Sequence, residues 1–180
     1  KLLPLKHTQL SLGTYVTFAE LFASDCNSIS ADSLSQLLQV LQTFQPHTAD
    51  VNSSIQFIRM LKEGFLMLHR LNSEISSANI ATVFQTLLGL FASDSQEIAS
   101  NTSDAIKVLV AKSISDSMIV EALNSKGGSS SEMDDQDQVE TSSPLLTIIQ
   151  VFTKAINYKN KTNLDLVLGA QEQLFKRIGK

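Results

Sequence analysis

The 180-residue chain contains few of the residues that interrupt helices and strands or that form disulfide bonds. It contains one cysteine, three prolines, seven glycines and no tryptophan. A single cysteine excludes an internal disulfide and favours an intracellular compartment. The shortage of proline and glycine disfavours a β-sandwich, whose strands are joined by turns rich in both. No continuous apolar run approaches the roughly 18–20 residues that span a bilayer, so we expect no membrane insertion.

Leucine and serine are abundant instead, and hydrophobic residues make up 43% of the chain. A chain of this length either buries roughly two thirds of its surface as one domain or forms a slice of a longer repeat protein. It begins at Lys1 rather than at methionine. We therefore expect it to be an excerpt from a longer protein.

Apolar residues recur at the 3.6-residue period of an α-helix along most of the chain. The widest stripe belongs to Ser54–Leu71, entered near Asp50, where apolar residues fill roughly half of the helix surface. A helix this apolar needs neighbours on both flanks. The other predicted helices are Leu10–Ala23 after a Thr8 cap, a helix from a Ser30 cap to Phe44, Ser77–Phe91, a helix from an Asp94 cap to Ile114, Ser117–Leu123, a helix from a Ser143 cap to Ile156, and a last helix capped by Thr162 or Asn163 and running to Ile178.

Alternate helix starts lie about 40 residues apart, which is typical of helix-pair repeats of the HEAT and armadillo kind. We therefore predict an all-α fold, a HEAT/armadillo-like helical-repeat solenoid segment of about eight helices. Residues 1–126 form the repeats, and residues 144–180 form a further helical pair of the same solenoid.

Residues 127–143 interrupt this pattern with five acidic and no basic residues and two adjacent glycines. This composition predicts an acidic, Ser-rich disordered loop. Ser129 and Ser131 each precede an acidic residue by three positions, a pattern read by acid-directed kinases. Phosphorylation at these serines would deepen the negative charge of the loop. The alternative is a solubilising insert without a regulatory role.

The net charge of −4 hides an uneven distribution. Residues 144–180 carry six basic and two acidic groups, so only this part favours a polyanion. Its basic residues are candidates for contact with a partner or with RNA: Lys154, Lys159, Lys161, Lys176, Arg177 and Lys180. Simple solubility explains them equally well, because Tyr158 is the only aromatic residue interleaved with the lysines between 154 and 161.

A second candidate surface is the polar arc of the central helix. It consists of Arg59, Lys62, Glu63, His69 and Arg70. Such an arc is usually a solvated face, and the alternative is a contact surface of the kind that solenoids present to protein or RNA.

Catalysis finds little support in the sequence. Cys26 with His7, His47 or His69 is the only available thiol and imidazole pair, and no nucleophile turn surrounds Cys26. No two of these residues share the i, i+4 spacing of a helical metal site. Gly127 and Gly128 lack the lysine and helix start of a phosphate loop. We expect no enzymatic activity, cofactor, metal or small-molecule substrate.

Three segments together resemble a known family: LPLKHTQLSLGTYVTFAELFAS, FIRMLKEGFLMLHRLN and LLGLFASDSQEIASNTSDAI. They are similar to the ribosomal-RNA-processing protein twelve family of large HEAT-repeat nucleolar proteins, over residues 2–120. The resemblance implies a non-enzymatic scaffold in pre-rRNA processing and in the maturation and export of the small-subunit precursor. It implies a nuclear and nucleolar location, with shuttling to the cytoplasm, and partners among pre-ribosomal proteins and pre-rRNA. The alternative is a nuclear-transport or other HEAT-repeat adaptor that binds only proteins.

Overall fold

The computed structural model describes residues 10–24, 28–126, 143–156 and 164–179. Across these residues the protein is all-α, with eight α-helices and no strand, which confirms the all-α part of the predicted fold and the number of helices. The helices are α1 (Leu12–Ala23), α2 (Ala31–Gln42), α3 (Val51–Leu71), α4 (Ser73–Gly89), α5 (Gln96–Ser113), α6 (Asp116–Lys126), α7 (Pro144–Ile156) and α8 (Leu164–Ile178), with a short 3-10 turn at Leu90–Ala92.

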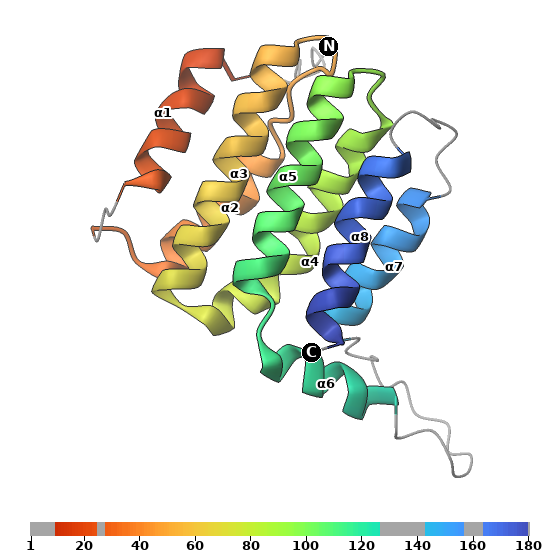
Figure 1. The fold of residues 1–180 in the computed structure, drawn as a ribbon. Helices are drawn as coiled ribbons and strands as arrows, with labels where there is room; N and C mark the ends of the chain where they lie inside the picture. Colours follow the sequence, from red (N-terminus) through yellow and green to blue (C-terminus); the bar gives the residue numbers. More distant parts are fainter. Residues whose placement is uncertain (1–9, 25–27, 127–142, 157–163, 180) are drawn as a thin grey trace, which may run out of the picture.

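The helices form two layers (Figure 1). In the front layer α1, α3, α5 and α8 lie side by side and run in the same direction, while α2, α4 and α7 form the back layer and run the opposite way. The helix α6 lies below the layers. Short connections make consecutive helices antiparallel, so the chain alternates between the layers. Because of this alternation, the front helices all end at the same edge of the molecule.

The centre of the array is α3, as the sequence predicts. It packs against α1 and α5 on its two flanks and against α2 and α4 behind. Its wide apolar stripe is covered up to the last turn, where Leu71 is 37% exposed, and Phe57, Leu61 and Phe65 have no exposed surface. The expectation of neighbours on both flanks of this helix is therefore confirmed.

The two helices that follow residues 127–142 join the same core. The rings of Phe84 in α4 and Phe152 in α7 meet edge to face with centroids 6.4 Å apart. In the front layer, Ser103 Oγ of α5 donates a hydrogen bond of 3.1 Å to the carbonyl oxygen of Leu166 in α8. The buried apolar residues from α1 to α8 consequently form one cluster.

The structure confirms two of the predicted helix caps and corrects the start of the first helix. Ser30 Oγ accepts from the backbone N–H of Ser33, and Asp50 Oδ1 accepts from that of Ser53. The first helix begins at Leu12, not at Leu10, because Ser11 Oγ caps it. The predicted caps Thr8, Thr162 and Asn163 lie outside the described residues.

Two other predicted helix starts are wrong by one turn or less. The fourth helix begins at Ser73 rather than Ser77, since Asn72 Oδ1 accepts from two backbone N–H groups of the first turn. The fifth is capped by Ser95 and not by Asp94, because the 3-10 turn carries the chain one residue further before the helix opens. Both corrections come from side chains that satisfy otherwise free helix-end amides.

Helices α6 and α7 differ from prediction in smaller ways. The helix α6 spans Asp116–Lys126 rather than Ser117–Leu123. The helix α7 begins at Pro144 as predicted, but Ser143 Oγ is buried without a hydrogen-bond partner instead of capping the helix. The start at Pro144 therefore depends on the fixed backbone angle of proline, which suits a first helical position.

The stretch Ser73–Ala92 is long and apolar enough to cross a membrane by length and composition, with a mean hydropathy of 1.4. Serines and threonines interrupt it, so it contains no continuous apolar run of that length. In the structure 44% of this window is buried. Most of the stretch is α4, which packs against α2, α3, α5 and α7. Its apolar residues are thus used by the core.

Uncharged polar side chains join α2 to α4 in the back layer. Gln39 Nε2 donates to Asn79 Oδ1, and Asn79 Nδ2 donates to Ser35 Oγ, both at 3.0 Å. Two turns further on, Thr86 Oγ1 donates to Gln42 Oε1 at 3.0 Å. These hydrogen bonds favour one register of α2 against α4, because a shift of one helix along the other would leave buried polar atoms without hydrogen-bond partners.

The buried phenol of Tyr15 should make the protein less stable at alkaline pH. Its ring is buried against Phe57, its hydroxyl donates to the carbonyl of Phe44, and burial raises the pKa of the phenol, helped by the charge of Asp50. Above a pH of about 10 the unfolded chain releases this proton and the folded chain keeps it, so the free energy of unfolding should fall as pH rises. Chemical denaturation between neutral and alkaline pH measures the fall. Tyr15→Phe should remove part of it, and an unchanged slope would contradict the assignment.

Candidate interaction face

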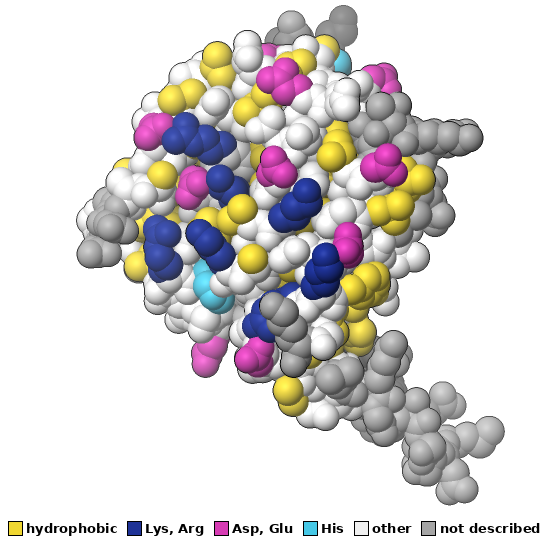
Figure 2. Space-filling model, in the orientation of Figure 1, with side chains coloured by type: hydrophobic (Ala, Val, Ile, Leu, Met, Phe, Trp, Pro, Cys, Tyr) yellow, Lys and Arg dark blue, Asp and Glu magenta, His cyan; other side chains and the backbone are white. Residues whose placement is uncertain are grey.

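The charges are segregated between the two layers. Every Lys and Arg whose side chain the structure describes belongs to α3, α5 or α8. The back-layer helices α2 and α4 contain no basic residue, and their charged residues are Asp32 and Glu74. Figure 2 shows the Lys and Arg side chains spread over the front of these three helices. The front layer is therefore the surface on which charge can recognise a partner.

The basic side chains concentrate where the front helices end. The last turns of α3, α5 and α8 contribute His69, Arg70, Lys112, Lys176 and Arg177, which we call the basic edge. Cations at helix C-termini complement the helix dipole. That effect alone does not explain the basic edge, since α1, α2 and α4 have no basic residue in their last turns.

Most of the front-layer cations are held by a neighbouring carboxylate. At the basic edge, Lys176 Nζ lies 2.7 Å from Glu172 Oε1, and Arg177 Nη2 lies 2.7 Å from Asp116 Oδ1 of α6. The hydrogen bond to Glu172 is also why the pKa of that carboxyl is lowered, with the charge of Lys176 adding to it. The pairs Arg59–Glu20, Lys62–Glu63 and Lys107–Asp104 follow the same pattern further along the face.

Two cations of the basic edge differ from the others. Within the described residues, Arg70 and Lys112 form no ion pair, and both side chains are exposed. They end adjacent helices of the front layer, because α3 packs directly against α5. Both are available to a partner without breaking an existing contact.

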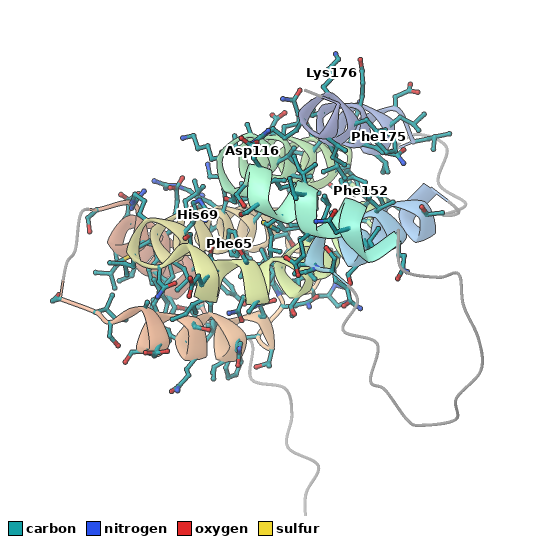
Figure 3. All side chains as sticks on the ribbon, turned by 90° about the horizontal axis from the view of Figure 1, so that it is seen from below. Phe65, His69, Asp116, Phe152, Phe175 and Lys176 are labelled. Atoms are coloured by element: carbon teal, nitrogen blue, oxygen red, sulfur yellow. The ribbon has the colours of Figure 1, made fainter. Side chains whose placement is uncertain are left out.

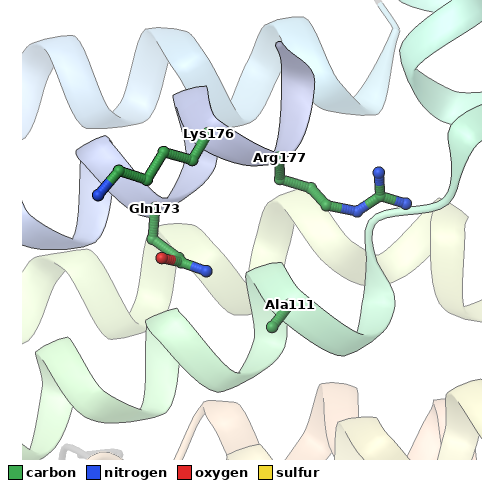
Figure 4. A pocket seen from close by; sticks show the side chains of 4 residues that line it. All are labelled: Ala111, Gln173, Lys176 and Arg177. Carbon is green, nitrogen blue, oxygen red and sulfur yellow. The ribbon is translucent and has the colours of Figure 1, made fainter. Parts of the chain in front are cut away.

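An open hollow of about 540 Å³ lies between α5 and α8 at the basic edge (Figure 4). Its lining residues are Ala111 from α5 and Gln173, Lys176 and Arg177 from α8. Ala111 and Gln173 face each other across the gap, while Lys176 and Arg177 extend in opposite directions along the rim. The small side chain at position 111 leaves room between two helices that otherwise pack closely.

The structure divides the six basic residues predicted as a contact surface. Lys176 and Arg177 lie at the basic edge, whereas Lys154 belongs to α7 in the back layer, and its side chain is not described. Lys159, Lys161 and Lys180 lie outside the described residues, as do the predicted phosphorylation sites Ser129 and Ser131.

Lys107, Ala111 and Lys112 were not predicted as part of any site. In the sequence Lys107 and Lys112 lie apart from any run of basic residues, and the front-layer position of α5, between α3 and α8, brings them into the face. Three residues of the predicted polar arc, Arg59, Lys62 and Glu63, lie on the front of α3. Arg59 pairs with Glu20, and Lys62 pairs with Glu63.

His69 and Ser76 form a contact that the sequence did not predict. His69 Nδ1 lies 2.8 Å from Ser76 Oγ, and Ser76 Oγ donates to the carbonyl of Ser73 at 2.8 Å. Which side chain donates in the His69–Ser76 hydrogen bond depends on the tautomer of His69. Ser76 is 1% exposed. A hydroxyl buried in this way is closed to a substrate, and the contact braces the turn between α3 and α4.

The structure describes only part of the one thiol and imidazole combination that the sequence offers, Cys26 with a histidine. Cys26 and His7 lie outside the described residues. His47 precedes α3 and His69 is in its last turn, so roughly 30 Å of helix separates them. Among the residues with described positions, no three His, Cys, Asp or Glu side chains gather as a metal site.

Comparison with protein-family models, with curated proteins and with solved structures finds no match. A rigid row of parallel helices with paired charges, two unpaired cations and a shallow hollow is suited to holding a partner.

Proposed function

We propose that this chain is a non-enzymatic scaffold segment of a ribosome biogenesis factor, acting in pre-rRNA processing and in the maturation and export of the small-subunit precursor in the nucleus and nucleolus. The observation that carries the binding role is the gathering of every described Lys and Arg on the front layer. The assignment to ribosome assembly depends on the resemblance of residues 2–120 to the ribosomal-RNA-processing protein twelve family.

The arrangement of helices supports a HEAT/armadillo-like solenoid. The pairs α2 and α3, α4 and α5, and α7 and α8 each place one helix in the back layer and the next in the front. Each pair packs on the preceding one through both of its helices. Stacked pairs of this kind produce a long surface made of equivalent helices, which suits binding without chemistry.

Co-purification of the full-length protein from native cells tests the proposal. We expect the wild-type protein to recover small-subunit precursor proteins and pre-rRNA. A variant with Arg70→Glu and Lys112→Glu should lose several-fold of this recovery, since both cations are free to pair with a partner. Val40→Glu is the control, because Val40 is 54% exposed on the back layer, so this change adds negative charge away from the front layer, although less of it than the double variant does.

Two outcomes would contradict parts of this proposal. Recovery of transport receptors without ribosome precursors would favour the alternative, a nuclear-transport or other HEAT-repeat adaptor that binds only proteins. Equal losses for the front-layer variant and for Val40→Glu would remove the front layer as the binding surface.

A further inference from the structure

We infer that the hollow between α5 and α8 binds an acidic segment of a protein partner, with carboxylates against Lys176 and Arg177 and an apolar side chain against Ala111. This inference rests on the proposed function, in which the front layer binds partners, and names the class of partner for one part of that layer. Protein is favoured over nucleic acid by the charge pattern, by the lack of a stacking platform and by the shape of the hollow.

The charge pattern of the face is alternating rather than uniformly basic. Glu172 lies beside Lys176, Asp104 beside Lys107, and Asp116 beside Arg177. A phosphate backbone carries a negative charge at every nucleotide, so a strand crossing this face would meet each carboxylate as well as each cation. A peptide can place single carboxylates at the cations and uncharged residues between them.

The described part of the face also lacks an aromatic platform for unpaired bases. The exposed aromatic residue of α8 is Phe175, at 51%. Figure 3 shows Lys176 pointing away from the array while Phe175 lies on a different side of the helix. Sequence-tolerant binding of single-stranded nucleic acid normally uses aromatic rings interleaved with the cations.

The hollow offers three kinds of contact at once. Ala111 supplies a small apolar surface, Gln173 supplies an amide that both donates and accepts, and the rim supplies two cations. A polypeptide has matching groups: an apolar side chain, a backbone amide and carboxylates. The combination is more specific for a peptide than a cationic surface alone.

The carboxylates that pair with the two cations at the rim can be replaced by carboxylates of a partner. The side chains of Glu172 and Lys176 are 65% and 64% exposed, so their ion pair is solvated, whereas the Arg177 pair is open mainly on the side of Asp116, since Arg177 is 26% and Asp116 86% exposed. Exposed pairs contribute little to stability because water and salt screen them. A partner carboxylate that also buries apolar surface in the hollow can replace them. Removal of these carboxylates should accordingly strengthen binding.

Fluorescence anisotropy with the full chain tests this inference using three probes. They are a peptide of glutamate and leucine, a peptide of glutamate and serine with equal length and charge, and single-stranded polyuridylate. We expect the glutamate–leucine peptide to bind most tightly. Ala111→Phe, which fills the hollow without changing charge, should weaken it by roughly 10-fold, as should Lys176→Glu with Arg177→Glu, while Asp116→Asn should tighten it several-fold.

The controls separate the hollow from general electrostatics. Val40→Glu should leave all three probes unaffected, and circular dichroism of each variant checks that it is folded. Tighter binding of polyuridylate than of either peptide, or equal binding of both peptides with no effect of Ala111→Phe, would overturn the inference. Either result leaves the recovery of ribosome precursors as a separate measurement, so the proposed function can stand or fall independently.

Discussion

Replacing Phe152 by alanine is expected to lower the free energy of unfolding by about 3–5 kcal/mol. The Phe152 ring has no exposed surface and meets the ring of Phe84 edge to face. It ties α7 to α4, so its loss removes both the transfer free energy of the ring and its aromatic contact, and leaves a cavity between two back-layer helices. Urea denaturation followed by circular dichroism measures the change.

The same variant tests whether α7 and α8 fold together with the helices before residue 127. Because one buried cluster runs from α1 to α8, we expect a single transition, with hydrogen exchange accelerated in α3 as much as in α7. Phe175→Ala is the matched control. It removes the same ring from a position that is 51% exposed, and should cost less than about 1 kcal/mol. Two separate transitions, or exchange accelerated only in α7 and α8, would show that the last two helices form an independent unit.

The all-α class was predictable because the residues that a helix buries are apolar and recur in the sequence with the helical period. Phe57, Leu61, Leu68 and their neighbours recur at 3.6 residues, and the helix with the widest stripe is the one surrounded by four others. Helix ends were less predictable. Ser11, Asn72 and Ser95 cap helices in place of the expected residues, because a serine-rich chain offers several capping side chains within one turn and tertiary packing selects among them.

The candidate site was predictable only in part, because it is assembled from three helices. Lys176 and Arg177 were singled out as part of a basic stretch of sequence, yet Lys154 from the same stretch belongs to the opposite layer. Ala111, which lines the hollow with them, comes from a helix more than fifty residues earlier. Counting charges along the sequence puts together residues that are close in the chain. In the folded protein, the residues that share a face are those whose helices lie in the same layer.

Among the described glycines, Gly64 has the least room for a side chain. A Cβ atom there would lie 2.5 Å from Leu38 Cδ2 of α2 and 2.9 Å from Phe22 Cδ2 of α1. Both distances are far below van der Waals contact, so α3 can approach α1 and α2 closely only because residue 64 has no side chain. The glycine therefore serves packing, and its helical backbone needs no unusual angle.

Gly64→Ala is expected to destabilise the protein by about 1–2 kcal/mol, although alanine is the better helix former. Overpacking costs about 1–3 kcal/mol, and the gain in helix propensity offsets at most about 1 kcal/mol of it. Gly89→Ala is the control, because a Cβ at Gly89 meets nothing within 4 Å. That change should stabilise the protein by up to about 1 kcal/mol, so the two glycines should respond with opposite sign.

A double variant identifies the cause of the Gly64 effect. Leu38→Ala alone should cost about 2–5 kcal/mol through the cavity that it leaves. Combined with Gly64→Ala it should cost less than the sum, by about 0.5–3 kcal/mol, because the new methyl group occupies space that Leu38 Cδ2 has vacated. Additive costs in denaturation measurements would mean that the backbone shifts to accommodate the methyl group. The close approach of α3 to α2 would then not depend on glycine at this position.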